Sequence, residues 1–471
     1  MRYGKSVCWI RRDLRLKDHV ALSEATHCSK EVAVVFVFDT TLLSRLKDKK
    51  DRRISFIHQA LLEMDQKLRK KGSALIVLHG DPKIEIPEFA QRIKAYAVFA
   101  NRDYEPFAKK CDKAVQTACN NLGIAFHDFK DQVIFEGDQL ATQSETPYKV
   151  FTPYKNKWLM ELNPSLYHDH RSLLKRLIPI NKLHGELVDW SLKKIGFESA
   201  DLWLKAGQSA AENQLKRFLS DLHDYDKNRD YPSISNGTSH LSVHLRFGTL
   251  SVRSLVRVAL ANLSSGSKTW LSELIWRDFY QMILDQFPHV VKGCFKQEYD
   301  RIQWPGTKNN FRLWRKGMTG YPIIDAAMRC FNKTGWMHNR LRMIVASFLT
   351  KDLLVDWRKG ESWFAQNLLD FDLAANNGGW QWCASTGCDA QPYFRIFNPI
   401  TQSKRFDPSG SFIREQLPEL KKFSNQQIHW PHKTNSSTQK EVNCILGRDY
   451  PKPIVIHSEQ RDKALGLFKA F

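Results

Sequence analysis

Carboxylates, amides and tryptophans are concentrated in one short segment of the chain, residues 370–399. Two acids, two asparagines and two tryptophans lie within its first thirteen residues: Asp370, Asp372, Asn376, Asn377, Trp380 and Trp382. Carboxylates and amides together donate and accept hydrogen bonds, which suits a ligand with many ring heteroatoms. Indole side chains suit a flat partner or the passage of single electrons. A helix end followed by a glycine-rich turn with packed aromatic residues is the plainer interpretation.

A second mixture of acidic, basic and aromatic residues has helical spacing. Glu273, Trp276, Arg277 and Tyr280 recur at intervals of three and four residues, so on a helix they share one face. Such a face is either a solvated surface that packs on a neighbour or the floor of a cavity for a flat polar ligand. The stretch alone favours neither interpretation.

The segment Asn236-Gly237-Thr238-Ser239 precedes an apolar-periodic stretch. Glycine permits close approach of a ligand to the backbone, and the start of a helix offers free N–H groups, so a phosphate cradle is possible there. An ordinary helix cap explains the same residues and is the commoner case.

Two further groups of residues could take part in chemistry. Arg342 could pair with a carboxylate such as Asp370, because a buried arginine needs such a partner. His338 has no second ligand at metal-binding spacing, so we expect no metal site. Three tryptophans on separate segments could relay electrons or could be ordinary core residues. They are Trp304, Trp357 and Trp380.

The whole chain is long and basic. Its 471 residues exceed one ordinary domain, so we expect two. Lysine and arginine number 71 against 50 acidic residues, and the resulting net charge of +21 suits nucleic acid or an acidic membrane surface as partner. A basic enzyme without such a partner would have the same composition.

Apolar runs and cysteines narrow the class of protein. The longest apolar run, Val32–Phe38, is far too short to span a bilayer, and arginines occupy the segment where a signal peptide is apolar. We therefore expect a soluble cytoplasmic protein without a membrane partner. Nine cysteines without a C-x-x-C pair argue against a disulfide framework and against a standard zinc or iron–sulfur site.

Short β-rich runs alternate with helical patterns in the first 130 residues. The runs are Ser6–Ile10, Val32–Phe38, Ala74–Leu78, Ala97–Ala100 and Ala125–Phe129. They predict a Rossmann-like α/β domain with a parallel sheet, although no G-x-G-x-x-G follows the first run. Residues 131–200 lack periodicity and predict a surface connector. Residues 201–471 have helical periodicity and predict an all-α domain.

Several long motifs are distributed over the whole chain. They are RRDLRL at 11–16, WRDFY at 276–280, TGYPIIDAAMR at 319–329, GWMHNRLRM at 335–343, ANNGGWQW at 375–382 and RIFNP at 395–399. Together they resemble the cryptochrome/photolyase family, and within it the class I cyclobutane pyrimidine dimer DNA photolyases. The resemblance implies an antenna-binding α/β domain over residues 1–130 and a connector over 131–200. It implies a helical FAD- and DNA-binding catalytic domain over 201–471.

The resemblance also implies a flavin site. The positions similar to the family's FAD contacts are Tyr225, Thr238, Ser239, Leu241, Ser242, Trp270, Arg342, Asp370, Phe371, Asp372 and Asn376. Arg342 and Asp370 would form an ion pair beside the isoalloxazine ring, and Asn376 would face its N5 position. A neutral amide there can both donate and accept, which suits several redox states.

The implied reaction is light-driven electron transfer from excited reduced FAD to a flipped-out pyrimidine dimer in UV-damaged DNA. Glu273 and Asn339 would be catalytic, and Trp380, Trp357 and Trp304 would form the photoreduction chain in that order outward. The implied substrate and DNA contacts are Arg229, Glu273, Trp276, Arg277, Tyr280, Asn339, Met343, Trp382 and Arg395. We expect a monomer that acts on the nucleoid.

Two departures from the family pattern bear on the cofactors. Phe371 stands where the family usually has glycine; we expect an ordinary backbone there, with the ring packed nearby. Glu105–Ala108 stands where folate-binding members usually have Asn-Glu. The family's antenna is a folate or a deazaflavin; this departure argues against folate and leaves a deazaflavin, another chromophore or none.

Two other functions fit the same resemblance. One is a cryptochrome-like blue-light photoreceptor that binds FAD without repairing DNA. The other is repair of the pyrimidine–pyrimidone photoproduct, whose subgroup tends to use a histidine pair where this chain has Met337-His338-Asn339.

Overall fold

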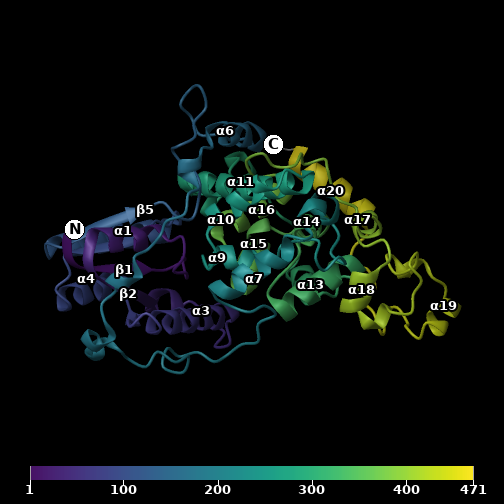
Figure 1. Cartoon of the computed structure of the whole chain (residues 1–471). Coiled ribbons are helices and arrows are strands. Elements are labelled where there is room, and N and C mark those ends of the chain that lie inside the picture. Colours follow the sequence, from purple (N-terminus) through teal and green to yellow (C-terminus); the bar gives the residue numbers. More distant parts are fainter. Residues whose placement is uncertain (1, 470–471) are drawn as a thin grey trace. The chain divides into compact units, whose positions relative to one another are not determined.

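The computed structural model describes residues 2–469 (Figure 1). The chain divides into two compact units. The first unit contains the chain up to Tyr148 together with Thr152–His223 and Ser239–Gln286. The second contains Lys149–Phe151, Asp224–Thr238 and the chain from Phe287 onward. The domain ranges 1–130, 131–200 and 201–471 stay predictions.

The first unit contains a sheet of five parallel strands. They are β1 (Tyr3–Ile10), β2 (Ser29–Asp39), β3 (Leu75–Gly80), β4 (Ala97–Asn101) and β5 (Ala125–Phe129). The strand order is β3-β2-β1-β4-β5, with Val7 opposite Ala33 in β2 and opposite Val98 in β4. All five strands lie where the β-rich runs predicted them, and the α/β class is confirmed.

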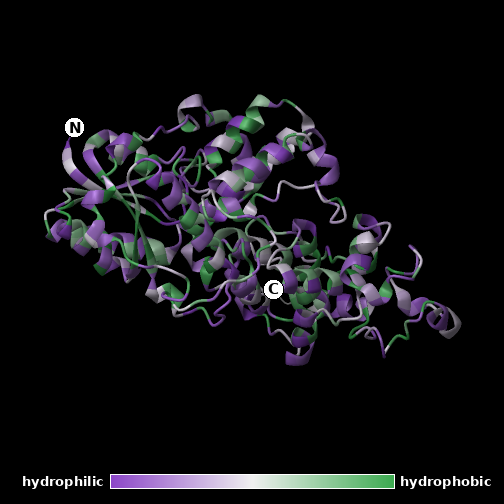
Figure 2. Cartoon of the chain, turned by 60° about the horizontal axis from the view of Figure 1, so that its bottom comes forward, coloured by the Kyte–Doolittle hydropathy of each residue, from purple (hydrophilic) through white to green (hydrophobic). Residues whose placement is uncertain are grey.

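The strands are buried because helices cover the sheet. The centres of β1 and β2 are continuous apolar runs that are almost completely buried, as expected for parallel strands covered on both faces. The helices of this unit are α1 (Val20–Cys28), α2 (Thr40–Leu43), α3 (Arg52–Arg69), α4 (Pro82–Arg92), α5 (Pro106–Asn121), α6 (Phe151–Glu161), α7 (Gln208–Phe218), α9 (Ser242–Arg246), α10 (Val252–Ala261) and α11 (Ser265–Gln286). Most helices carry both hydrophilic and hydrophobic residues (Figure 2).

The second unit is helical, as predicted. Its helices are α8 (Tyr225–Asn228), α12 (Lys308–Lys316), α13 (Pro322–Thr334), α14 (Asn339–Ser347), α15 (Trp357–Asn367), α16 (Leu373–Ala384), α17 (Pro399–Phe406), α18 (Ser411–Gln416), α19 (Ser436–Glu441) and α20 (His457–Lys469). A π-helical turn, η8 (Phe348–Asp352), follows α14 directly. Buried side chains from α12 to α18 form one apolar core that includes Trp314, Trp357 and Trp380.

Short 3-10 turns connect these elements. They are η1 (Pro164–Leu166), η2 (Leu174–Arg176), η3 (Ile180–Lys182), η4 (His184–Glu186), η5 (Leu222–Asp224), η6 (Pro288–Val291), η7 (Gln297–Arg301), η9 (Pro418–Leu420) and η10 (Pro431–Lys433). Within residues 2–469, no helix has the length and hydrophobicity required to cross a bilayer. All nine cysteines are free.

The connector predicted over residues 131–200 contains an α-helix that sequence periodicity did not indicate. Helix α6 forms at Phe151–Glu161 despite Pro153, because a proline in the first turn removes no intrahelical hydrogen bond. Trp158 of α6 is completely buried, and its indole N–H donates to Asp278 at 3.1 Å. Another part of the connector lies on the sheet, since the Ile178 N–H donates to the carbonyl of Val32.

Candidate functional site

Helix α16 positions the residues of the most polar segment. Asp372 caps its N-terminus by accepting from the Ala375 N–H at 3.1 Å, as short acidic side chains commonly do. The helix ends at Ala384, and the C-cap residue Ser385 has a left-handed φ of 67°. The segment is thus a capped helix with aromatic residues, and its polar groups gather at the helix start.

Arg342 and Asp370 form the ion pair that their residue types predicted. The Arg342 Nη2 lies 2.8 Å from Oδ2 and 3.1 Å from Oδ1 of Asp370. The Asp370 side chain is only 2% exposed, and the Arg342 Nε donates to the Met337 carbonyl at 2.8 Å. The guanidinium is therefore held by one carboxylate and one backbone oxygen, which fixes its orientation.

Asn376 lies on the first turns of α16, next to an acid that the sequence did not single out. Its Nδ2 donates to the backbone oxygen of Glu361 on α15 at 3.2 Å. Burial raises the pKa of Glu361 to about 7, although the contact with the Asn376 side chain lowers it. No local pattern marks Glu361, because the two residues meet only where α15 packs on α16.

Phe371 has an ordinary backbone. It is not among the residues with positive φ in the described part of the chain, so glycine's conformational freedom is not required there. Its ring packs against the apolar core of the second unit. Asp370 and Asp372 on either side keep the ion pair and the helix cap described above.

The three tryptophans of the predicted electron chain belong to the core of the second unit. Trp380 is 3% exposed and Trp357 1% exposed, whereas Trp304 is only partly buried. The ring of Trp380 lies 5.1 Å from that of Phe364 and 6.1 Å from that of Trp314. Two of the three rings are thus buried, and Trp304 lies nearer to solvent.

Helix α11 presents Glu273, Trp276, Arg277 and Tyr280 on one half-buried face, as their spacing predicted. The rings of Trp276 and Tyr280 are 5.4 Å apart. Trp270, one turn earlier, is 3% exposed and packs against Phe218. A half-buried face with an acid and two aromatic rings offers both stacking and hydrogen bonding to a flat polar ligand.

Arg277 is already bonded within the first unit. Its Nη1 donates to the backbone oxygen of Gln132, and the guanidinium lies 3.9 Å from the carboxylate of Asp278. Asp278 is buried and accepts from the Ile134 N–H at 2.9 Å; burial raises its pKa. Arg277 thus connects α11 to the segment after β5 through a hydrogen bond. The sequence predicted only a phosphate contact for this residue.

The segment predicted to hold the ribityl-phosphate part of a flavin is a set of tight turns. Adding a Cβ to Gly237 would bring it within 2.8 Å of the Asn228 carbonyl oxygen, so this turn needs glycine. Tyr225 and Thr238 belong to the second unit, and the Arg229 guanidinium lies 5.2 Å from the ring centre of Tyr225. The other three predicted contacts belong to the first unit: Ser239, Leu241 and Ser242.

The remaining predicted substrate residues in the second unit are partly or fully exposed. Asn339 begins α14, and its Nδ2 lies 4.0 Å from the Met343 sulfur one turn later. Trp382 is half-buried on α16, two residues after the buried Trp380. Arg395 is exposed in the loop before α17.

The region after β4, where an antenna chromophore was considered, is held by ion pairs. Glu105 lies 2.8 Å from Arg12 and 3.2 Å from Arg246, and the Tyr104 hydroxyl donates to Glu136 at 2.9 Å. These contacts bind the acid of the Glu105–Ala108 segment to the first unit's own arginines.

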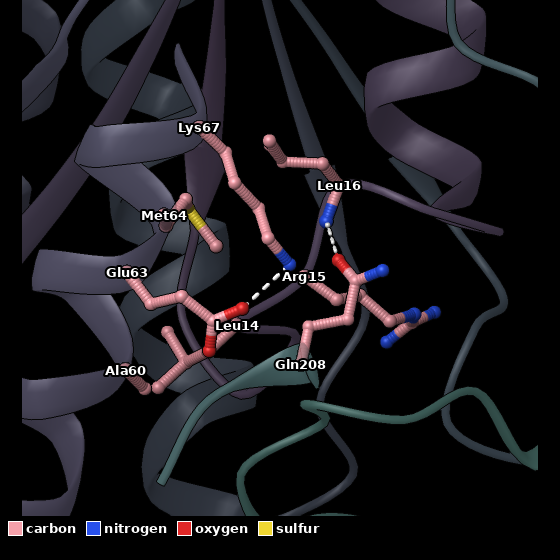
Figure 3. A pocket seen from close by; sticks show the side chains of 8 residues that line it. All are labelled: Leu14, Arg15, Leu16, Ala60, Glu63, Met64, Lys67 and Gln208. Atoms are coloured by element: carbon pink, nitrogen blue, oxygen red, sulfur yellow. Dashed lines mark hydrogen bonds and ion pairs between the residues drawn. The ribbon is translucent and has the colours of Figure 1, made fainter. Parts of the chain in front are cut away.

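A small pocket elsewhere in the first unit is not a ligand site (Figure 3). Its empty volume is about 160 Å³, but it has no room for a water molecule. The hydrogen bond from the Leu16 N–H to Gln208 and the ion pair of Lys67 with Glu63 close it. The structure shows no cluster of three potential metal ligands between residues 2 and 469.

The residues of the second unit fit a flavin by their chemistry. A buried carboxylate just before α16 is paired with an oriented guanidinium, and a side-chain amide lies on the first turns of the helix; these groups can donate to and accept from a heteroaromatic ring. The fold and this site together define a flavoprotein with an α/β unit and a helical unit.

Comparisons with known proteins identify the family. Residues 6–171 match the family described as DNA photolyase, and residues 270–470 match the FAD binding domain of DNA photolyase. A deoxyribodipyrimidine photo-lyase of Vibrio cholerae is 39% identical over 474 residues, covering 98% of each chain. The chain belongs to the DNA photolyase family, and FAD is its cofactor.

Three solved structures share the whole fold. A bacterial class III photolyase from Agrobacterium tumefaciens is 31% identical, with a TM-score of 0.88 and coverage of 100% of this chain and 98% of that one. An archaeal photolyase from Sulfolobus tokodaii with two FAD molecules is 33% identical, with a TM-score of 0.83 and coverage of 99% and 100%. A Synechocystis cryptochrome is 28% identical, with a TM-score of 0.88 and coverage of 99% and 100%.

Proposed function

We propose that this protein repairs cyclobutane pyrimidine dimers in DNA with the energy of light. The half-buried face of α11 carries this proposal, because it combines an acid with two neighbouring aromatic rings, which suit an extruded pair of bases. The net charge of +21 suits the polyanionic substrate.

The chain's own residues have separate tasks in this proposal. Bound FAD supplies, when it is reduced and excited, the electron that opens the cyclobutane ring. The Arg342–Asp370 pair orients that cofactor, and the Asn376 amide donates to it or accepts from it. Asp372 adds a contact while capping α16.

The substrate contacts follow from the same resemblance. Glu273 forms a hydrogen bond with the damaged bases, and Trp276 and Trp382 each offer an indole on which a base can stack. Tyr280, Asn339 and Met343 complete the contacts to the lesion. Three arginines bind backbone phosphates: Arg229, Arg277 and Arg395. Arg277 does so with the N–H groups that its bond to Gln132 leaves, since a guanidinium has five.

The tryptophans return the cofactor to its reduced state. Single electrons pass inward from Trp304 to Trp357 and then to Trp380. Trp304 is only partly buried, whereas the other two are buried. A second chromophore, a folate or a deazaflavin, would extend light absorption. We further propose that the enzyme works as a cytoplasmic monomer on nucleoid DNA.

A repair assay tests this proposal. Purified, reduced protein is incubated with a dimer-containing oligonucleotide under blue or near-UV light, with a dark sample as control. We expect light-dependent loss of dimers, a strong decrease in Glu273→Gln, and binding that weakens steeply with salt. No loss of dimers in light would refute the proposal.

A cryptochrome-like photoreceptor is the second candidate function. The similarity to the Synechocystis cryptochrome over 99% of this chain favours it. Light-dependent flavin reduction without dimer loss in the same assay would support the photoreceptor.

A further inference from the structure

Trp357, the middle tryptophan of the proposed chain, has an unusual polar environment. It is the first residue of α15 and is 1% exposed. Its indole Nε1 is buried and has no hydrogen-bond acceptor among residues 2–469 that meets normal geometry. A buried N–H without an acceptor destabilises the folded state, and proteins retain few such groups, often at functional sites.

The thiol of Cys294 lies next to this indole and is completely buried. Burial first, and then a hydrogen bond to Asp300, raise the pKa of Cys294 to about 12, although the Trp357 indole has the opposite effect. The thiol is therefore protonated at neutral pH, with the indole N–H on one side and a carboxylate on the other. The Cys294 backbone N–H also donates to Asp300 at 2.9 Å, which fixes the carboxylate there.

Arg358 completes this cluster. Its guanidinium carbon lies 5.0 Å from the Trp357 ring centre, and its Nη2 lies 3.7 Å from the Cys294 sulfur. The same guanidinium pairs with Asp300 and, at 3.2 Å, with Asp356. Asp300 is 37% exposed and can exchange protons with solvent.

We propose that Cys294 and Asp300 form a proton exit for oxidised Trp357. This inference rests on the proposed function, because oxidised Trp380 must first take one electron from Trp357. The indole N–H bond then breaks, and its proton goes to the Cys294 sulfur. The thiol's original proton goes to the Asp300 carboxylate. The products are a neutral indolyl radical, an unchanged thiol and a carboxylic acid that exchanges with solvent.

The charges around Trp357 supply a driving force for this step. A tryptophan radical cation beside Arg358 places two positive charges close together, which a low-dielectric interior makes unfavourable. Loss of the indole proton removes one of them. The two carboxylates that pair with Arg358 reduce this repulsion, and Asp300 is the one with access to both the thiol and solvent.

The plain alternative is that Cys294 is only a small buried core residue. That role explains its burial but not its position between an indole N–H and a carboxylate. Cys444 is a matched control, because it is also completely buried in the same core and lies away from this cluster. Asp300 and Cys294 are positioning residues in this scheme, since they act through Trp357.

Flash photolysis in a Trp304→Phe background tests the proton exit, because this variant keeps the oxidised site at Trp357. We expect the transient spectrum to change from the cation to the neutral indolyl radical, more slowly in D₂O. Adding Cys294→Ala or Asp300→Asn should slow that change at least tenfold, and adding Cys444→Ala should not. An unchanged rate in Cys294→Ala, or a cation that persists in Trp304→Phe alone, would overturn the proposal.

The outcome in Trp304→Phe distinguishes a failure of the electron chain from a failure of the proton exit. Absence of any tryptophan radical in Trp304→Phe would contradict the proposed electron chain, whereas a persistent cation contradicts only the proton exit. The infrared S–H stretching band of the unilluminated protein, assigned by its loss in Cys294→Ala, gives a readout that needs no photochemistry. We expect this band to shift in Asp300→Asn and in Trp357→Phe. A band unchanged in both variants would overturn the relay.

Discussion

Gly360 controls how closely α15 approaches Trp380, so replacing it with alanine should disturb both stability and flavin photoreduction. A Cβ at Gly360 would lie 2.5 Å from Trp380 Cζ3 and 2.5 Å from Leu349 Cδ2. Ordinary contacts between carbon atoms are about 3.5–4.0 Å, so one of these groups must move by about 1 Å or more.

The surroundings of Trp380 allow little movement. Its side chain is 3% exposed and is bounded by the rings of Phe364 and Trp314. Overpacking of a close-packed core typically costs about 1–3 kcal/mol. At about 2–4 °C per kcal/mol for a domain of 150–250 residues, the expected fall in Tm of the second unit is about 2–12 °C.

Thermal unfolding and the rate of flavin photoreduction measure the two consequences of Gly360→Ala. We expect a lower Tm and slower photoreduction, with repair by previously reduced enzyme less affected. Gly466→Ala is the control, because Gly466 lies on α20 and an added Cβ there meets no atom within 4 Å. The same Tm and photoreduction rate in Gly360→Ala as in the unchanged protein would refute the packing argument.

Three further predictions concern the second unit. Trp380→Phe should impair flavin photoreduction but not repair by reduced enzyme. Trp382→Ala should instead weaken binding of dimer-containing DNA by roughly 1–3 kcal/mol, the contribution of one stacked base. Equal defects of both variants in both assays would contradict these separate roles of the two tryptophans. Asp370→Asn leaves Arg342 without its carboxylate, so the purified variant should retain less FAD, measured by the ratio of flavin to protein absorbance, and full retention would count against the pair. Burial lowers the pKa of Lys351 from 10.5 to about 7, so its positive charge destabilises the folded state below about pH 7 and this penalty fades as the pH rises toward 10.5. At about 1.4 kcal/mol per pKa unit, Lys351→Met should raise the free energy of unfolding by up to about 5 kcal/mol at pH 7, and by progressively less at higher pH, in denaturant titrations. The control Lys359→Met, at an exposed position, should show no such trend.

Local sequence patterns predicted the elements well where periodicity was strong. The five parallel strands follow from apolar runs separated by helical spacing, and the shared face of α11 follows from residues three and four positions apart. Helix α6 was missed, because Pro153 and the lack of an apolar stripe hid it. Its stability comes instead from burial of Trp158 against Asp278, a contact between distant segments.

The sequence by itself determined the family, the flavin and the residue types at the candidate site, because long motifs retain their order along the chain. It also pointed to the Arg342–Asp370 pair, since a buried cation needs an anion. Only the tertiary structure showed Glu361 beside Asn376, Arg277 bonded to Gln132, and Cys294 between Trp357 and Asp300. Backbone periodicity governs neighbours along one helix or strand, whereas such pairings depend on how separate elements pack.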